Sequence, residues 1–186
     1  RVLVTDARTA LGQEVAGALK AAGAAEIFLG VATPWLPFDG QDRLDRIGET
    51  VPLDLTDEVS VRALAGALGG KTDILINTAD HVRAGGIMDQ PTATLRDTFE
   101  VSVMGLQRLA QHFGPAMMAR GADGVRSATA FVDVLSVYAL ATWSAYGAHS
   151  AAAAARHSIL QGLRGEMRAA GIRVMSACTR PPEDDW

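Results

Sequence analysis

Short apolar runs rich in β-branched residues alternate along the whole chain with longer segments in which apolar residues recur at helical spacing. The apolar runs predict strands at residues 2–5, 26–31, 50–53, 74–77, 130–135 and 173–177. The segments between them predict helices at residues 11–22, 57–68, 92–120 and 144–170. Strands that alternate with helices in this way are typical of a parallel sheet covered on both faces. The pattern therefore predicts a single α/β domain over residues 1–186 with three layers, α/β/α.

The first strand leads into a turn of small residues and then into a helix, in the sequence VLVTDARTALG at residues 2–12. Strand, tight turn and helix in this order form the first half of a βαβ unit. In a doubly wound, Rossmann-like sheet this turn holds the pyrophosphate of a dinucleotide, because the helix N-terminus offers unpaired N–H groups and the positive end of a dipole. We therefore expect a doubly wound parallel sheet whose ligand site lies near this turn.

The turn resembles the T-G-x-x-x-G-x-G motif of the short-chain dehydrogenase/reductase (SDR) family, whose cofactor is NAD(P). Thr5 and Gly12 match this motif, with Leu11 between its last two glycine positions. Asp6 and Ala10 stand where the first two glycines belong. A carboxylate at Asp6 repels each cofactor phosphate by about 3 kcal/mol at roughly 5 Å and an effective dielectric near 20. Alternatively, Asp6 caps the helix and takes N–H groups that a phosphate would use. Both interpretations imply weak cofactor binding.

Two later segments resemble further cofactor-binding motifs of the family. The segment LDLTD is similar to D-V-T-D, and this resemblance implies that Asp54 contacts the adenine amino group. The segment at residues 74–80, ILINTAD, is similar to a strand that ends in N-N-A-G. Asn77 and Ala79 match that motif, whereas Thr78 replaces its second asparagine.

Asp80 stands in place of the glycine of N-N-A-G. In a doubly wound sheet this strand lies beside the first strand, across the topological switch point. We therefore expect Asp80 and Asp6 to face one crevice, where they place two carboxylates against the pyrophosphate and the nicotinamide ribose. The alternative is that Asp80 pairs with Arg8, His81 or Arg83 at the surface.

The residues after the second strand give no preference between the two cofactors. An acidic residue there favours NAD, and an arginine favours NADP. Ala32 and Thr33 occupy the expected positions and are neither.

The second half of the chain resembles the catalytic part of the family. Ser136 ends a strand at the place of the catalytic serine, and Tyr146 opens the next helix at the place of the catalytic tyrosine. The lysine of the Y-x-x-x-K motif is Ser150 here. The asparagine of the V-N-x-x-G motif, which the resemblance implies would hold a proton-relay water, is Ser102.

The missing lysine matters because the tyrosine must exchange a proton near neutral pH, whereas the reference pKa of a phenol is about 10. A lysine one helical turn further on lowers that pKa by roughly three units, at about 4 Å and an effective dielectric near 20. Ser150 supplies no such charge. His149, at i+3, is not a permanent cation, and Arg156 lies about 15 Å further along the helix.

Composition excludes several other classes of protein. A net charge of −4 with few basic clusters argues against binding to nucleic acid or to an anionic membrane. No apolar run reaches the ~18 residues of a membrane span, and no signal-peptide pattern is present. The single Cys178 excludes an internal disulfide and fits a reducing cytoplasm. No group of His, Cys or carboxylate residues has the spacing of metal ligands.

Three functions remain open. The first is a catalytically impaired subunit that joins an active SDR paralogue in an oligomer, through helices 92–120 and 144–170, as the resemblance implies. The second is an active NAD(P)-dependent oxidoreductase that acts on a carbonyl or an alcohol through Ser136 and Tyr146. The third is a cofactor-free enzyme, similar to SDR dehalogenases or lyases, that uses the same two residues. Because family domains continue with a substrate loop and a last strand, we expect the domain at 1–186 to lack or not include them.

Overall fold

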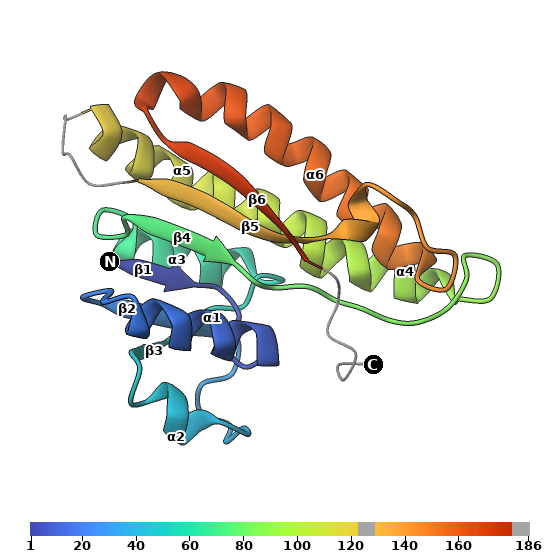
Figure 1. Cartoon of the computed structure of the whole chain (residues 1–186), viewed down its shortest axis with the longest axis horizontal. Helices are drawn as coiled ribbons and strands as arrows, with labels where there is room; N and C mark the ends of the chain where they lie inside the picture. The colour runs from blue at the N-terminus through green and yellow to red at the C-terminus, as the bar shows by residue number, and fades with distance from the viewer. Residues whose placement is uncertain (123–128, 180–186) are drawn as a thin grey trace.

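The computed structural model describes residues 1–122 and 129–179, and its described strands form one parallel sheet (Figure 1). From one edge to the other the strands are β3 (Glu49–Pro52), β2 (Ile27–Val31), β1 (Val2–Val4), β4 (Ile74–Asn77), β5 (Ala130–Ser136) and β6 (Arg173–Thr179). Every pair of neighbouring strands is parallel. The chain winds outward in one direction from β1 and in the other from β4, so the switch point lies between these two strands. The predicted doubly wound sheet is confirmed.

Helices cover both faces of this sheet. One face carries α1 (Ala10–Ala21) and the short α2 (Gln41–Leu44). The opposite face carries α3 (Glu58–Leu68), α5 (Gly105–Ala122) and α6 (Gly147–Met167).

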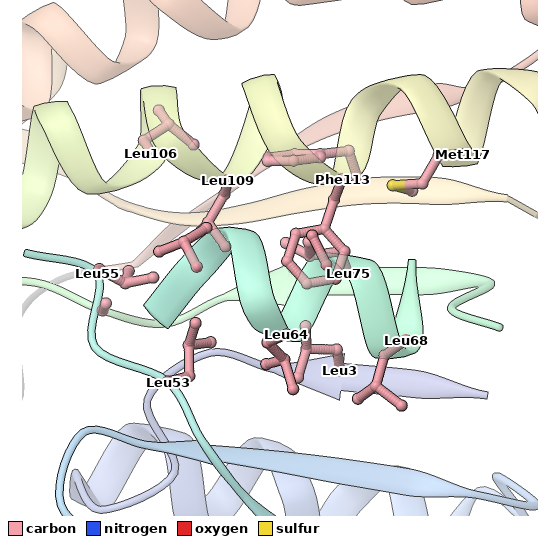
Figure 2. Close-up of a cluster of buried hydrophobic side chains, with 14 of the residues drawn as sticks. Leu3, Leu53, Leu55, Leu64, Leu68, Leu75, Leu106, Leu109, Phe113 and Met117 are labelled. Carbon is pink, nitrogen blue, oxygen red and sulfur yellow. The ribbon is translucent and has the colours of Figure 1, made fainter. Parts of the chain in front are cut away.

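The alternation of side chains along β1 divides the core into two clusters. Leu3 belongs to the larger cluster and Val4 to the smaller one, as expected for successive residues of a strand. Figure 2 shows the larger cluster, in which Phe113 and Met117 of α5 lie beside leucines of α3 and of the strands. The parallel strands are therefore buried on both faces, which explains why their sequences are continuously apolar.

The predicted helix at 92–120 is divided into three parts. α4 (Thr92–Thr98) continues into a π-helical turn, η1 (Phe99–Met104), and α5 begins only at Gly105. Ser102 lies in η1. Since π-helical turns interrupt helices at functional sites, this turn directs attention to Ser102.

The predicted helix at 144–170 begins later than its sequence pattern indicates. Ser136 at the end of β5 is followed by a 3₁₀ turn, η2 (Val137–Ala139), and Tyr146 is the N-cap of α6. A second 3₁₀ turn, η3 (Arg168–Ala170), ends this helix.

Gly12 allows α1 to pack against the turn that precedes it. A Cβ atom at Gly12 would lie 1.9 Å from the Asp6 carbonyl oxygen and 2.9 Å from Ala7 Cα. Both are backbone atoms of the turn itself, so the turn and the helix would have to separate. The one glycine of the dinucleotide motif that this chain retains is therefore required by the fold.

We expect Gly12→Ala to lower the free energy of unfolding by about 2 kcal/mol or more, because the backbone must move to accommodate the methyl group. Gly66→Ala is the matched control, since its Cβ would meet nothing within 4 Å in α3. That change should be neutral or stabilise the protein by about 0.5–1 kcal/mol. Urea unfolding measures both, and equal stability of Gly12→Ala and the unsubstituted protein would contradict the packing argument.

Candidate active site

A chain of buried hydrogen bonds joins the carboxyl ends of β1 and β4 to the middle of β5. The Thr5 hydroxyl donates to Asn77 Oδ1 at 2.7 Å, and Asn77 Nδ2 donates to Asp133 Oδ1 at 2.6 Å. The Thr78 N–H donates to the Thr5 hydroxyl at 3.2 Å, and Ala79 is buried in the larger core cluster. The structure thus brings together the motif residues Thr5 and Asn77, and their hydrogen bonds fix the ends of β1 and β4 at the switch point.

In the turn after β1, the N-cap of helix α1 is Thr9 and not Asp6. Thr9 Oγ1 accepts a hydrogen bond from the Gly12 N–H at 3.0 Å and donates to the Asp6 carbonyl at 3.2 Å. The proposed capping role of Asp6 is therefore wrong, because the helix begins at Ala10 and Asp6 lies too far before it. The Asp6 carboxylate instead accepts a bond from the Arg8 N–H at 3.3 Å.

Asp6 keeps a carboxylate at the place where the motif has a glycine. Burial raises the pKa of Asp6 above its ordinary value of 3.8, and the Arg8 N–H and guanidinium offset this only in part. The Arg8 side chain itself reaches beyond the end of β2, where Nη1 donates to Thr33 Oγ1 at 2.8 Å. Leu11 is half-buried and Ala10 is exposed.

Asp54 is engaged in the loop between β3 and α3. Its Oδ1 accepts hydrogen bonds from the Thr56 N–H at 2.8 Å and from the Thr56 hydroxyl at 2.7 Å. Asp54 is half-buried, and its carboxylate therefore serves a tight turn in this structure.

Asp80 lies where the family resemblance places it but has partners that the sequence did not predict. Its Oδ1 accepts hydrogen bonds from the Ser102 hydroxyl at 2.7 Å and the His81 backbone N–H at 2.9 Å. Arg156 Nη1 lies 3.2 Å from Asp80 Oδ2, and His149 Nδ1 lies 3.6 Å from Oδ1. Asp80 is therefore not an uncompensated negative charge beside Asp6, and no ion pair joins it to the side chains considered at the surface. The expected surface pairing of Asp80 is therefore wrong, because its side-chain partners are Arg156, His149 and Ser102. The expected position of Asp80 at the switch-point crevice stays a prediction.

Arg156 is the centre of this arrangement, and we call Asp80, Asp133 and Arg156 the Arg156 ion cluster. Arg156 donates to Asp133 through Nε at 3.2 Å and through Nη2 at 2.8 Å, and Nη2 also donates to the Val134 carbonyl at 3.0 Å. The side chains of Arg156 and Asp133 are both 0% exposed. Burial alone would lower the pKa of Arg156, but Asp133 and Asp80 raise it, so the guanidinium stays charged.

The same contacts change the pKa of Asp80. Burial alone would raise the pKa of Asp80, but the Arg156 guanidinium, His149 and the Ser102 hydroxyl hold it well below its usual value of 3.8. Asp80 and Arg156 are therefore both charged, and the cluster joins α6 to β5 and to the loop after β4.

The catalytic positions are occupied by residues with structural hydrogen bonds. Ser136 is 5% exposed, and its hydroxyl accepts a bond from the Tyr138 N–H at 3.2 Å. Ser150 is 1% exposed, and its hydroxyl accepts from the Trp143 N–H at 3.3 Å and donates to the Trp143 carbonyl at 3.4 Å. Ser102 donates to Asp80. Ser150, which stands at the lysine position of the Y-x-x-x-K motif, therefore holds the loop before α6 by hydrogen bonds.

Tyr146 is half-buried within a cluster of aromatic rings. Its ring stacks on Tyr138 with centroids 6.0 Å apart and is tilted against Trp143 at 5.0 Å. The buried ring of His149 meets the Tyr138 ring edge to face at 6.1 Å. These contacts keep the Tyr146 phenol close to the end of β5, because η2 with Tyr138 directly follows that strand.

The loop after β4 is held against the start of α6. The Gly85 N–H donates to the Ala145 carbonyl at 2.6 Å, and the Gly147 N–H donates to the Gly85 carbonyl at 3.1 Å. A surface cavity of about 530 Å³ opens beside this loop and is lined in part by His81 and Gln90. The loop that carries Asp80 is therefore also held at Gly85.

Neither a metal cluster nor a membrane span is found in the part of the chain that the structure describes. Within residues 1–122 and 129–179, no three His, Cys, Asp or Glu side chains are placed to hold a metal ion. Among the helices of the same residues, none is both long and apolar enough to cross a bilayer.

The sheet order and the retained glycine turn at the switch point define a Rossmann-like, doubly wound fold. The short chain dehydrogenase family matches residues 1–182, and the chain belongs to this family. "Probable oxidoreductase EphD" of Mycobacterium bovis is 28% identical over 182 residues, which cover 95% of this chain and 30% of that protein. "Short-chain dehydrogenase virD" of Hypocrea virens is 27% identical over 146 residues, which cover 76% of this chain and 48% of that protein. The chain thus spans less than half the length of these two relatives.

Solved structures agree with this assignment. A short chain dehydrogenase from Burkholderia cenocepacia, solved in complex with NADP, superposes with a TM-score of 0.82 at 25% identity. The superposition covers 94% of this chain and 69% of that one. A short-chain dehydrogenase from Streptomyces avermitilis gives a TM-score of 0.81 at 26% identity, with 95% of this chain and 64% of that one covered.

Arg156, Asp133 and His149 are the site residues that the sequence argument missed. A signal was present, because His149 and Arg156 lie seven residues apart on the same face of α6 as the buried Ala152, Ala153 and Leu160. A charged residue on the buried stripe of a helix requires a partner of opposite charge. Only the fold shows that the partners come from the loop after β4 and from β5.

We expect the unfolding free energy of the protein to fall as the pH drops below about 4. An acid whose folded-state pKa lies below its unfolded value of 3.8 stabilises the fold above that value, and this stabilisation is lost as the pH falls toward the folded-state pKa. Asp80→Asn removes this contribution, so its stability should change less between about pH 6 and about pH 3. Urea unfolding at several pH values measures the difference. The exposed Asp39→Asn is the control, and an Asp80→Asn curve parallel to that of the unsubstituted protein would contradict the prediction.

Proposed function

We propose that this chain is an SDR subunit with little or no dehydrogenase activity of its own, which assembles with a catalytically active SDR chain. The residue that replaces the motif lysine after Tyr146 carries the proposal. One helical turn further along α6, the hydroxyl of Ser150 is bonded to the Trp143 backbone. The buried cation on the same helix, Arg156, is bound by two carboxylates. Neither residue supplies the Tyr146 phenol with a positive charge.

The chemical consequence follows from the ordinary acidity of a phenol. Proton transfer at neutral pH needs a group whose pKa lies near that pH, whereas a phenol has a reference pKa of about 10. A nearby ammonium group supplies about 4 kcal/mol of this difference at an effective dielectric near 20. Without it, proton transfer to or from a carbonyl or alcohol substrate is expected to be slow.

The residues at the switch point also fit a dinucleotide poorly. The Asp6 carboxylate stands in the turn where a diphosphate would approach the backbone, and a repulsion of about 3 kcal/mol lowers affinity by about a hundredfold. Asp80 stands at the glycine position of the N-N-A-G motif and forms an ion pair with Arg156. NADP is bound in the relative from Burkholderia cenocepacia. In this chain the guanidinium of Arg8 reaches Thr33 beyond the end of β2, where an arginine would favour NADP over NAD. For this chain we nevertheless propose that either cofactor binds weakly or not at all.

A groove on the outer side of α5 and α6 supports the assembly with another SDR chain. This groove has a volume of about 510 Å³ and is lined largely by small and apolar residues, among them Ala110, Gly114, Met118, Ile159 and Leu163. Small residues at a helix surface allow a second pair of helices to approach closely. Two residues of the alanine run at 151–155, Ala152 and Ala153, are buried inside the subunit and are not available for contact with another chain.

Calorimetric titration with NADP⁺ and with NADH tests the cofactor part of the proposal. We expect no binding of either at micromolar concentration, because of the repulsion from Asp6. Asp6→Gly combined with Ser150→Lys should bind more tightly and show the first measurable turnover, with circular dichroism as the check on folding. Micromolar binding by the unsubstituted chain would contradict the proposal and would favour an active oxidoreductase.

Co-purification of the tagged chain with an SDR chain that carries intact motifs tests the partner. We expect Gly162→Arg, which places a long charged side chain in the groove, to abolish the association. Gly165→Arg is the matched control, because Gly165 lies on the same helix with open space around it and does not line the groove. Equal recovery of the partner with both variants, or no partner with the unsubstituted chain, would contradict the proposed assembly.

A further inference from the structure

We propose that the Arg156 ion cluster closes the switch-point crevice to dinucleotides, so that Asp80 acts as an internal occupant of the place where the nicotinamide half of a cofactor would lie. The inference rests on the proposed function, in which the chain binds NAD(P) weakly or not at all. It adds a further cause of weak dinucleotide binding, separate from the missing lysine and from Asp6. That cause is a salt bridge which holds the loop after β4 in one position.

The first argument is the location of Asp80. It follows the end of β4 by three residues, and β4 lies beside β1 across the switch point. Doubly wound sheets bind their ligands outside the carboxyl ends of the strands at this point. The Asp80 side chain is 22% exposed, whereas the other two members of the cluster are 0% exposed. Asp80 is therefore the member that borders the open side of the site.

The second argument is the number of groups that hold Asp80 in place. Its two oxygens are contacted by Arg156, by the Ser102 hydroxyl and by the His81 N–H, with His149 at 3.6 Å. These partners come from α6, from η1 and from the loop itself. A ligand that needed this space would have to separate the Asp80 carboxylate from the buried Arg156 guanidinium, which would then keep only one of its two carboxylate partners.

The third argument is the connection between the cluster and the turn after β1. Asp133 accepts a hydrogen bond from Asn77, and Asn77 accepts one from Thr5. Thr5 is the last residue before Asp6 and the glycine turn. The same network that fixes Asp80 thus fixes the two strand ends between which a dinucleotide would lie.

The cluster has to be removed as a unit, because loss of Arg156 alone would leave two carboxylates buried in the interior. The triple variant Asp80→Gly, Asp133→Asn, Arg156→Leu removes all three charges, and uncharged side chains of similar volume replace buried ion clusters without unfolding proteins. Asp133→Asn keeps an acceptor for the Asn77 amide. The exposed pair Glu14 and Arg43, joined at 2.9 Å, provides a control variant, Glu14→Gln with Arg43→Leu.

Binding of NADP⁺ and NAD⁺ is then measured by calorimetry in four proteins. These are the unsubstituted chain, Asp6→Gly, the triple variant, and the triple variant combined with Asp6→Gly. We expect the combined variant to bind at least one of the two dinucleotides at least about tenfold more tightly than Asp6→Gly alone. The control pair in the Asp6→Gly background should leave affinity unchanged.

Equal affinity of the combined variant and of Asp6→Gly, while the unsubstituted chain does not bind, would overturn this inference and leave the proposed function standing. Micromolar binding by the unsubstituted chain would instead overturn the proposed function. If the triple variant does not fold, Asp80→Gly in the Asp6→Gly background replaces it, because it removes the Asp80 side chain and leaves Arg156 paired with Asp133. That variant should bind several-fold more tightly than Asp6→Gly, and unchanged affinity would overturn the inference as well.

Discussion

A guanidinium buried between two carboxylates is the interaction on which the functional half of this structure depends. Arg156 of α6 joins Asp133 in the middle of β5 to Asp80 in the loop after β4, and two of these three side chains are fully buried. A charge in such a place is tolerated only when it is paired, so each member requires the others. The position of the loop, the bond to Ser102 in the π-helical turn and the hydrogen bonds across three strands all follow from this pairing.

The chain keeps the SDR fold although several residues of the family motifs have changed. The parts of the motifs that it keeps are those that hold the backbone together, because Gly12 allows the close approach of α1 and Thr5 and Asn77 bind one another. The parts that have changed are those that would face a ligand. Asp6 and Asp80 replace glycines. Ser150 replaces the lysine, and its hydroxyl is hydrogen-bonded to the Trp143 backbone. Fold and cofactor binding therefore depend on different residues of the same motifs.

The architecture could be predicted from the sequence because the local spacing of apolar residues determines it. Six strands and the order of the helices follow from short apolar runs and from helical spacing. The partners of Asp80 could not be predicted in this way, because Arg156 is far from it in sequence and meets it only through the sheet topology. The capping of α1 by Thr9 was missed for a local reason, since the helix begins one residue before the predicted start and Thr9 then takes the N-cap. The π-helical turn at Ser102 has no marker in the apolar pattern.

The central claim is that the chain's own ions occupy the place of a dinucleotide. A crystal structure of the unsubstituted protein, grown in millimolar NADP⁺, tests it most directly. The account predicts Asp80 paired with Arg156 and no dinucleotide in the crevice between β1 and β4. A diphosphate seated on the N-terminus of α1, with Asp80 turned away from Arg156, would contradict it.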